Sequence, residues 1–289
     1  MQVDARGGLG NQLFGLFAAV WSGQTMMRKS VLDITNIDRN HTSGKYDLKS
    51  FKLSSSILVR KQGPVEAKAR RLSNLILGSS RESIFQDRSV NSRELLLQKL
   101  ELEIGQGKLP PKVVLKGFFQ DFSFFDSVEP NAKKLELYKP STDYLLIAEE
   151  IKKKRPIVVH IRLGDYLNHK IGMLSENYFM SSIEAIKKTL GNREIWIFTN
   201  SPEQLGQLYP GISKQNFRVL TPSGDPAESM ILMSKADGIV CSNSTFSFWA
   251  AKLSKIECKV VVPKNYSKDS ETQIRNNPAH WIQIENTWM

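Results

Sequence analysis

The stretch PIVVHIRLGDY, residues 156–166, decides the fold. Its first half is apolar and β-branched, which predicts a buried strand at Ile157–Ile161. That strand runs into His160, Arg162 and Asp165. An imidazole, a guanidinium and a carboxylate at the end of a core strand indicate either a salt-bridged strand end or a ligand site.

Strands and helices alternate regularly after this stretch, and the alternation predicts βαβ units with a parallel sheet in a Rossmann-like layer structure. Ligands of such sheets lie at the carboxyl ends of the strands. The polar residues expected at those ends are His160, Arg162, Asn200, Asn243 and Ser244. The expected strands are Ile157–Ile161, Glu194–Thr199, Phe217–Leu220, Gly238–Cys241 and Val260–Val262, and the expected helices are Glu176–Leu190, Pro202–Leu208, Ala227–Lys235 and Thr245–Leu253.

Four polar residues, Ser242-Asn243-Ser244-Thr245, separate one of these strands from the helix that follows it. The first amides of a helix have no intrahelical partner, and an anion placed there is stabilised by them. The segment therefore predicts a phosphate pocket. Ordinary helix capping explains one hydroxyl, but not four polar residues in a row. Phe246 is a core residue in the simpler interpretation, and we keep it among the donor-binding candidates.

Charged side chains suggest roles around a phosphorylated ligand. The fork of Arg162 suits a diphosphate and would offset the charge on a leaving phosphate. Asp165 is either a general base or a group that holds Arg162 or His160 in place. His160 either bonds a base or ribose or is a structural histidine. Glu228 either accepts from a purine N–H pair or favours a helix N-terminus.

The N-terminal half opens with the same kind of unit. Met1–Arg6 reads as a strand, Gly7–Gln12 (GGLGNQ) as a glycine-rich loop, and residues 12–27 as a helix. This order resembles the phosphate-binding opening of a nucleotide fold, although a tight turn that needs glycine also explains it. We expect two domains, residues 1–150 and 151–289, with the last residues packing back on the first domain.

Composition limits the class of protein. The chain has 289 residues, a net charge of +11 and 40% hydrophobic residues, which suit a soluble protein with an anionic partner. We expect no membrane span and no signal peptide, hence a cytoplasmic protein with reduced, buried cysteines. The chain has no Asp-x-Asp pair and no histidines at metal-ligand spacing, so we expect no bound divalent metal.

Four blocks of this sequence together resemble the bacterial α-1,2-fucosyltransferases, which are inverting glycosyltransferases of family 11. They occur in the family's order and span most of the chain. The blocks are GGLGNQLF at 7–14, GFFQDFSFF at 117–125, HIRLGDY at 160–166 and ILMSKADGIVCSNSTFSFWAAKL at 231–253.

The resemblance implies a GT-B fold with two Rossmann-like domains that face each other across a cleft. It also implies GDP-β-L-fucose as donor, no metal cofactor, and transfer with inversion onto a galactose hydroxyl. By position, Arg162 would contact the diphosphate and Ser244 with its neighbours would form the second phosphate contact. Asn11, with Gly10 beside it, would lie near the reacting sugar.

Two positions depart from the family's pattern. Leu163 stands where the motif has a second arginine, so one cation is missing. Ser229 stands where the family often has aspartate, which leaves the guanine contact to Glu228 or another group.

The hypothesis is therefore a GDP-fucose:β-galactoside α-1,2-fucosyltransferase that acts on a surface glycan or O-antigen unit. The acceptor is a galactose-containing glycan, lipid-linked in one version of the hypothesis. The positive charge would then suit peripheral contact with the anionic inner face of the cytoplasmic membrane. The alternatives are a fucosyltransferase of other linkage, a transferase of another GDP-sugar, and a non-catalytic protein that binds nucleotides or nucleic acid. The leading hypothesis involves no nucleic acid.

Overall fold

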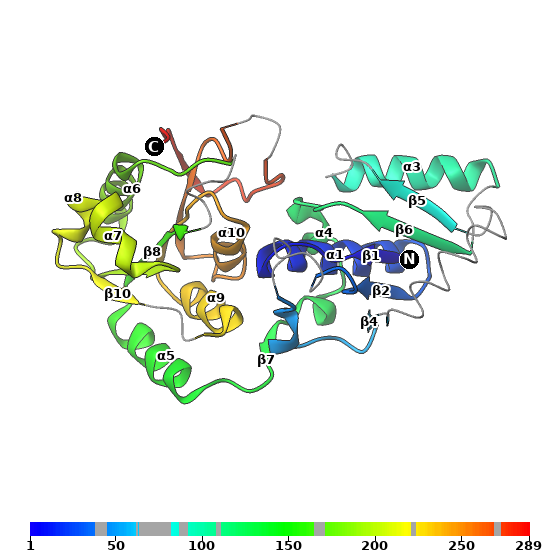
Figure 1. Ribbon diagram of the computed structural model, residues 1–289, viewed down its shortest axis with the longest axis horizontal. Coiled ribbons are helices and arrows are strands. Elements are labelled where there is room, and N and C mark those ends of the chain that lie inside the picture. The colour runs from blue at the N-terminus through cyan, green and yellow to red at the C-terminus, as the bar shows by residue number, and fades with distance from the viewer. Residues whose placement is uncertain are drawn as a thin grey trace. The chain divides into compact units, whose positions relative to one another are not determined.

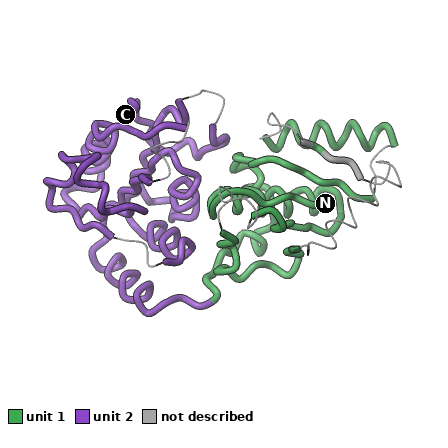
Figure 2. The backbone as a smooth tube through the Cα atoms, in the orientation of Figure 1, with its two compact units in different colours: residues 1–138 green, residues 139–289 purple. Residues whose placement is uncertain are grey.

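The computed structural model describes residues 1–37, 45–61, 63, 82–86, 92–107, 111–164, 171–220, 224–268 and 273–289. The chain forms two compact units, residues 1–138 and 139–289 (Figure 2). The boundary lies before helix α5 (Thr142–Lys154), not at the expected position 150/151, which falls inside that helix. The reason is that α5 packs against α9 (Pro226–Ser234) of unit 2.

Unit 1 is built on a parallel sheet in the order β4-β2-β1-β6-β5 (Figure 1). Helix α1 (Leu9–Thr25) packs closely on this sheet, because a Cβ at Gly15 would lie 3.6 Å from Val3 and 3.8 Å from Leu32. The strands are β1 (Gln2–Asp4), β2 (Ser30–Asp33), β4 (Ile57–Arg60), β5 (Glu82–Gln86) and β6 (Lys112–Lys116). The remaining elements are η1 (Leu48–Ser50), α3 (Arg93–Gly105), α4 (Phe122–Asp126), η3 (Pro130–Lys133) and an antiparallel pair of β3 (Phe51–Lys52) with β7 (Glu136–Leu137).

Unit 2 is built on a second parallel sheet, in the order β10-β9-β8-β11-β12-β13. Strand β8 (Ile157–Ile161), taken from the stretch that decides the fold, pairs with β9 on one side and β11 on the other. The other strands are β9 (Ile195–Thr199), β10 (Arg218–Leu220), β11 (Gly238–Val240), β12 (Lys259–Pro263) and β13 (Ile282–Ile284). The other helices are α6 (Glu176–Leu190), α7 (Pro202–Leu208), α8 (Pro210–Ser213) and α10 (Thr245–Lys252).

The apolar side chains of β8 explain its central place. Ile157, Val159 and Ile161 are fully buried in one cluster that also holds residues of α6 and β9. Helix α6 lies against β11, where a Cβ at Gly238 would come within 2.8 Å of Ile186. A larger residue at position 238 would require the side chains of Ile186 and Leu190 to shift.

The C-terminal residues belong to unit 2. The amide of Met289 donates to the carbonyl of Met173 at 2.9 Å, and Trp288 forms an isolated bridge with Leu174. The last residues therefore pair with the segment before α6, and their expected packing on the N-terminal domain stays a prediction. This pairing joins elements more than a hundred residues apart, which no local pattern encodes.

The expected elements are largely confirmed, with changed ends. Helix α1 starts at Leu9 and not at residue 12. Strands β4, β5 and β13 were not expected, because no long apolar run marks them in the sequence. The sequence also predicts a helix at 67–77, which lies outside the described residues. It predicts that most of the five phenylalanines at 118–125 belong to the core: Phe119, Phe122 and Phe124 are buried, whereas Phe118 is 42% exposed. None of the described helices is long and apolar enough to cross a membrane.

Candidate functional site

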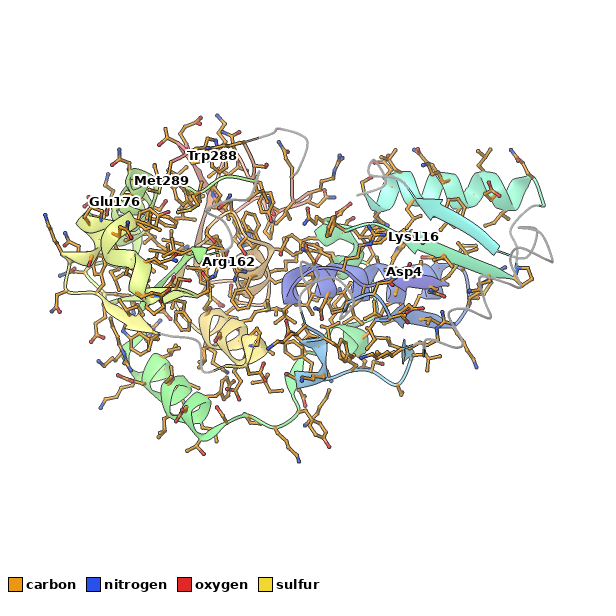
Figure 3. All side chains as sticks on the ribbon, in the orientation of Figure 1. Asp4, Lys116, Arg162, Glu176, Trp288 and Met289 are labelled. Carbon is orange, nitrogen blue, oxygen red and sulfur yellow. The ribbon has the colours of Figure 1, made fainter. Side chains whose placement is uncertain are left out.

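The chain leaves strand β8 at Arg162, which Figure 3 labels in unit 2. Its half-buried side chain follows a strand whose five residues are all buried. Asn200, which follows β9, makes two hydrogen bonds with the backbone of Leu163, the residue after Arg162. Its Oδ1 accepts from the amide of Leu163 at 2.9 Å, and its Nδ2 donates to the carbonyl of Leu163 at 3.2 Å. Gly164 then turns the chain with φ +62°. Asn200 thus fixes where Arg162 emerges.

Leu163 has a physical explanation at the position where the family's motif has arginine. Its side chain is fully buried and belongs to the core cluster of unit 2. A charged head there would lose its hydration, which is costly without a partner. In this chain the side chain at position 163 packs in the core, and the cationic role of Arg162 stays a prediction. Asp165, the third polar group of the motif, lies outside the described residues.

The segment after β11 is the second half of the site, and every residue of Cys241–Ser244 is held by a hydrogen bond. We call this segment the β11 loop. Asn243 donates from Nδ2 to the carbonyl of Gly172 at 2.9 Å. Ser244 caps helix α10, since its Oγ accepts from the amide of Phe246. Thr245 begins the helix and is buried with the loop. The segment expected to bind phosphate is therefore a helix N-terminus held by hydrogen bonds, and phosphate binding stays a prediction.

His160, near the end of β8, contacts the β11 loop and α10. Its Nδ1 lies 2.7 Å from the Oγ of Ser242, and its ring centroid lies 5.3 Å from that of Phe246. Burial and, to a smaller extent, the charge of Arg162 lower the pKa of His160 from 6.5 to about 3. The imidazole is therefore neutral at physiological pH. A group with so low a pKa is a poor proton acceptor, so the geometry favours a hydrogen-bonding role over general base catalysis.

Phe246 has a mixed environment. The helix that carries it is buried along most of its length, whereas Phe246 itself is half-buried and stacks at 31° on the neutral ring of His160. It is thus not a core residue like its neighbours Phe248 and Trp249. An apolar ring face beside an anion site suits the apolar side of a sugar or a base.

Glu228 is buried in the first turn of α9 and is committed to the start of α5. Its Oε1 accepts from the amide of Ser141 at 2.5 Å and its Oε2 from the hydroxyl of Ser141 at 2.7 Å. The same hydroxyl accepts from the amide of Tyr144, which caps α5. The observed role of Glu228 is therefore to join two helix N-termini. Contact with guanine stays a prediction.

The glycine-rich loop of unit 1 forms a compact start to α1. Gly7 has φ +65°, and a Cβ there would lie 2.6 Å from Nδ2 of Asn11. Asn11, in the first turn, accepts at Oδ1 from Nε2 of Gln120 at 2.9 Å. Gln12 is buried and holds Gly7 and residues 45 and 47 through its amide. Gly10 is buried within the helix, so it acts through close packing.

Sequence reasoning missed the residues that hold the site from behind. Tyr178 on α6 donates to the carbonyl of Cys241 at 2.7 Å, and Ser247 on α10 donates to the carbonyls of Ser242 and Ser244. Tyr178 lies in an ordinary amphipathic helix outside the four blocks, and Ser247, although inside the block at 231–253, reads there as one more small residue of a buried helix. Among the described residues there is no group of three His, Cys, Asp or Glu side chains that could hold a metal ion.

The arrangement presents a guanidinium, a helix N-terminus and a set of hydroxyls at the carboxyl ends of two neighbouring parallel strands. Such a set suits the phosphates of a nucleotide ligand. Two α/β units, each built on a parallel sheet, are the architecture expected of a GT-B fold.

Comparison with known proteins gives the family. The sequence model of glycosyl transferase family 11 matches residues 142–285, which is nearly all of unit 2. The chain belongs to this family and is a glycosyltransferase.

Three curated relatives are similar over much of the chain. The α-1,2-colitosyltransferase of Escherichia coli is 24% identical, covering 96% of this chain and 97% of its own. The O-antigen biosynthesis glycosyltransferase WbnK of Escherichia coli is 26% identical, covering 96% and 98%. The galactoside 2-α-L-fucosyltransferase of Caenorhabditis elegans is 25% identical, covering 88% of this chain and 68% of its own.

The fold is also found among solved structures. The fucosyltransferase NodZ from Bradyrhizobium superposes with a TM-score of 0.50 at 13% identity, over 88% of this chain and 92% of that one. The match confirms the expected fold class at the level of architecture.

Proposed function

We propose that this glycosyltransferase moves L-fucose from GDP-β-L-fucose, with inversion, to the 2-hydroxyl of a β-galactoside. The observation that carries the proposal is the convergence of Arg162 and the N-terminus of α10 at the carboxyl ends of β8 and β11. The names of the relatives add to it, since they cover α-1,2 transfer of a fucose-like sugar, a galactoside acceptor and O-antigen assembly.

In this mechanism the acceptor hydroxyl attacks the anomeric carbon of fucose on the face opposite the diphosphate. The C–O bond to GDP breaks, and the negative charge passes to the β-phosphate. Arg162 and the amides that begin α10 stabilise that charge, so the barrier falls without a metal ion. His160, held neutral, orients the site through Ser242. Asp165 remains the candidate acceptor for the hydroxyl's proton, and the acceptor sugar is assigned to unit 1 with Asn11 near it.

A donor and acceptor screen with product linkage analysis tests the proposal. We expect turnover with GDP-fucose and a β-galactoside, and an α-1,2-linked product by NMR. Turnover with GDP-mannose and none with GDP-fucose would refute the donor assignment. Transfer of colitose is the second candidate, because one relative carries that activity in its name. Formation of a transfer product with GDP-colitose and with no other donor would favour colitose transfer.

The Arg162→Ala variant tests the mechanism within the screen. Removing a charge-assisted contact to the leaving group should lower kcat/KM about a hundredfold or more. The matched control is Lys188→Ala, whose side chain is exposed on α6 and should leave the rate unchanged. Near-normal transfer by the Arg162 variant would remove the diphosphate assignment.

We also propose that the protein is cytoplasmic and touches an anionic membrane through the outer face of α5. Leu145 and Leu146 are 53% and 66% exposed there, and Lys152 and Lys153 follow on the same helix. Exposed leucines beside lysines suit the boundary of an anionic bilayer. A Leu145→Ser/Leu146→Ser variant should sediment less with phosphatidylglycerol vesicles than wild type, whereas Ile256→Ser, 79% exposed elsewhere, should not. If the wild-type protein does not sediment with these vesicles, the proposed membrane contact is wrong.

A further inference from the structure

Tyr178 lies beneath the β11 loop and is held in a way that the proposed chemistry does not use. Its ring is 2% exposed, and it stacks edge-on against Phe179 with centroids 5.1 Å apart. Its hydroxyl donates to the carbonyl of Cys241, the first residue after β11, at 2.7 Å. Burial raises the pKa of the Tyr178 phenol well above its ordinary value, so the hydroxyl keeps its proton and remains a donor.

This bond is made where the sheet stops supporting the chain. The amide of Cys241 still donates to Val261 of β12 at 2.9 Å. On the other side, the pairing of β11 with β8 ends at Val240 and Val159, one residue before Cys241. The carbonyl of Cys241 is therefore received by a side chain from α6 instead of a strand. A buried carbonyl left without a partner destabilises its segment.

The loop that Tyr178 supports is tied at each following residue. Ser242 contacts His160, Asn243 contacts Gly172, and Ser244 caps α10. Ser247 adds bonds from below to the carbonyls of Ser242 and Ser244. A site that stabilises developing charge needs its donors fixed to within about 0.5 Å, which supporting hydrogen bonds provide.

We propose that Tyr178 is a positioning residue for the anion site at the start of α10. By holding the carbonyl of Cys241, it sets the height of the β11 loop relative to β8, and hence the distance from the α10 amides to the phosphates. It touches no substrate. The inference rests on the proposed function only in naming the anion as the diphosphate of the donor.

Tyr209 supplies a matched control. It is also fully buried in the same core cluster, and its hydroxyl also donates to a backbone carbonyl, that of Leu174 at 2.6 Å. Its acceptor lies before α6 and outside the β11 loop. Tyr178→Phe and Tyr209→Phe therefore remove the same atom from the same environment, and only the first should disturb the anion site.

Calorimetry with GDP and with inorganic pyrophosphate measures the effect. We expect Tyr178→Phe to weaken both about tenfold and to raise the donor KM more than it lowers kcat, because the ground-state diphosphate contact is lost. Tyr209→Phe should keep both affinities within about twofold. Its Tm should fall by about as much as the Tm of Tyr178→Phe. Such a tenfold loss is what removing one hydrogen bond gives.

Other outcomes separate the two ideas. Equal affinities for the two variants, or an effect that follows Tm alone, would overturn the positioning role. If the wild-type protein binds pyrophosphate but not GDP, the assignment of GDP as the donor nucleotide is wrong. The comparison of pyrophosphate affinities between the two variants still tests the role of Tyr178. If Tyr178→Phe does not fold, Ser247→Ala removes the loop's other support and should weaken pyrophosphate in the same way; unchanged binding in that variant overturns the inference.

Discussion

Acidification should destabilise unit 2 through His160. The pKa of this imidazole is about 3 in the folded protein and 6.5 in its ordinary state. The unfolded chain therefore binds a proton that the folded chain refuses between these values. The penalty is absent above about pH 6.5, grows as the pH falls, and levels off below about pH 3.

The magnitude follows from the two values. A shift of one pKa unit corresponds to about 1.4 kcal/mol, so the full penalty is roughly 5 kcal/mol. Between pH 7 and pH 5, protonation of the unfolded state alone lowers the free energy of unfolding by about 2 kcal/mol. No screening correction applies, because the ring is buried and its charge would face Arg162.

Urea unfolding at pH 7 and pH 5, for wild type and His160→Gln, measures the contribution of His160 to the free energy of unfolding. Glutamine can still hydrogen-bond Ser242 but does not titrate. Intrinsic fluorescence reports mainly unit 2, because of the five tryptophans only Trp21 lies in unit 1. Wild type should lose about 2 kcal/mol more than the variant on acidification. A difference below about 0.5 kcal/mol would mean that His160 is protonated in the folded protein, and the neutral assignment would be wrong.

Two further predictions concern single contacts. Gly7→Ala should lower stability by about 1–2 kcal/mol, because φ is +65° and the new Cβ meets Asn11; Gly8→Ala, which meets nothing within 4 Å, should be nearly neutral in thermal unfolding. Equal Tm values would remove the argument from backbone conformation. Glu228→Ala should lower stability by about 2–3 kcal/mol, because two bonds to Ser141 are lost from a buried carboxylate, while Glu228→Gln should recover part of it. A stable Glu228→Ala variant with altered guanine selectivity would instead favour the base-reading role.

Local pattern was enough to determine the alternating elements of unit 2. Periodicity and β-branched runs mark strands and helices directly, so β8, β9, β11, β12 and the helices between them were expected at nearly their observed positions. The rule that parallel sheets bind ligands at strand ends then placed Arg162 and Ser244 in one site. Strands β4 and β13 were missed because they lie in polar stretches without the buried apolar run that marks β8 and β12, as their half-exposed residues show.

Tertiary structure alone decided which polar groups are still available for a ligand. Glu228 is joined to Ser141, 87 residues away in the chain, which no spacing could indicate. His160 loses its basicity only because folding buries it beside Arg162. Leu163 reads as a missing cation in the motif, yet the structure turns its side chain into the core. Residue types are written in the sequence, whereas burial and partners depend on contacts between distant segments, and these set the chemistry of the site.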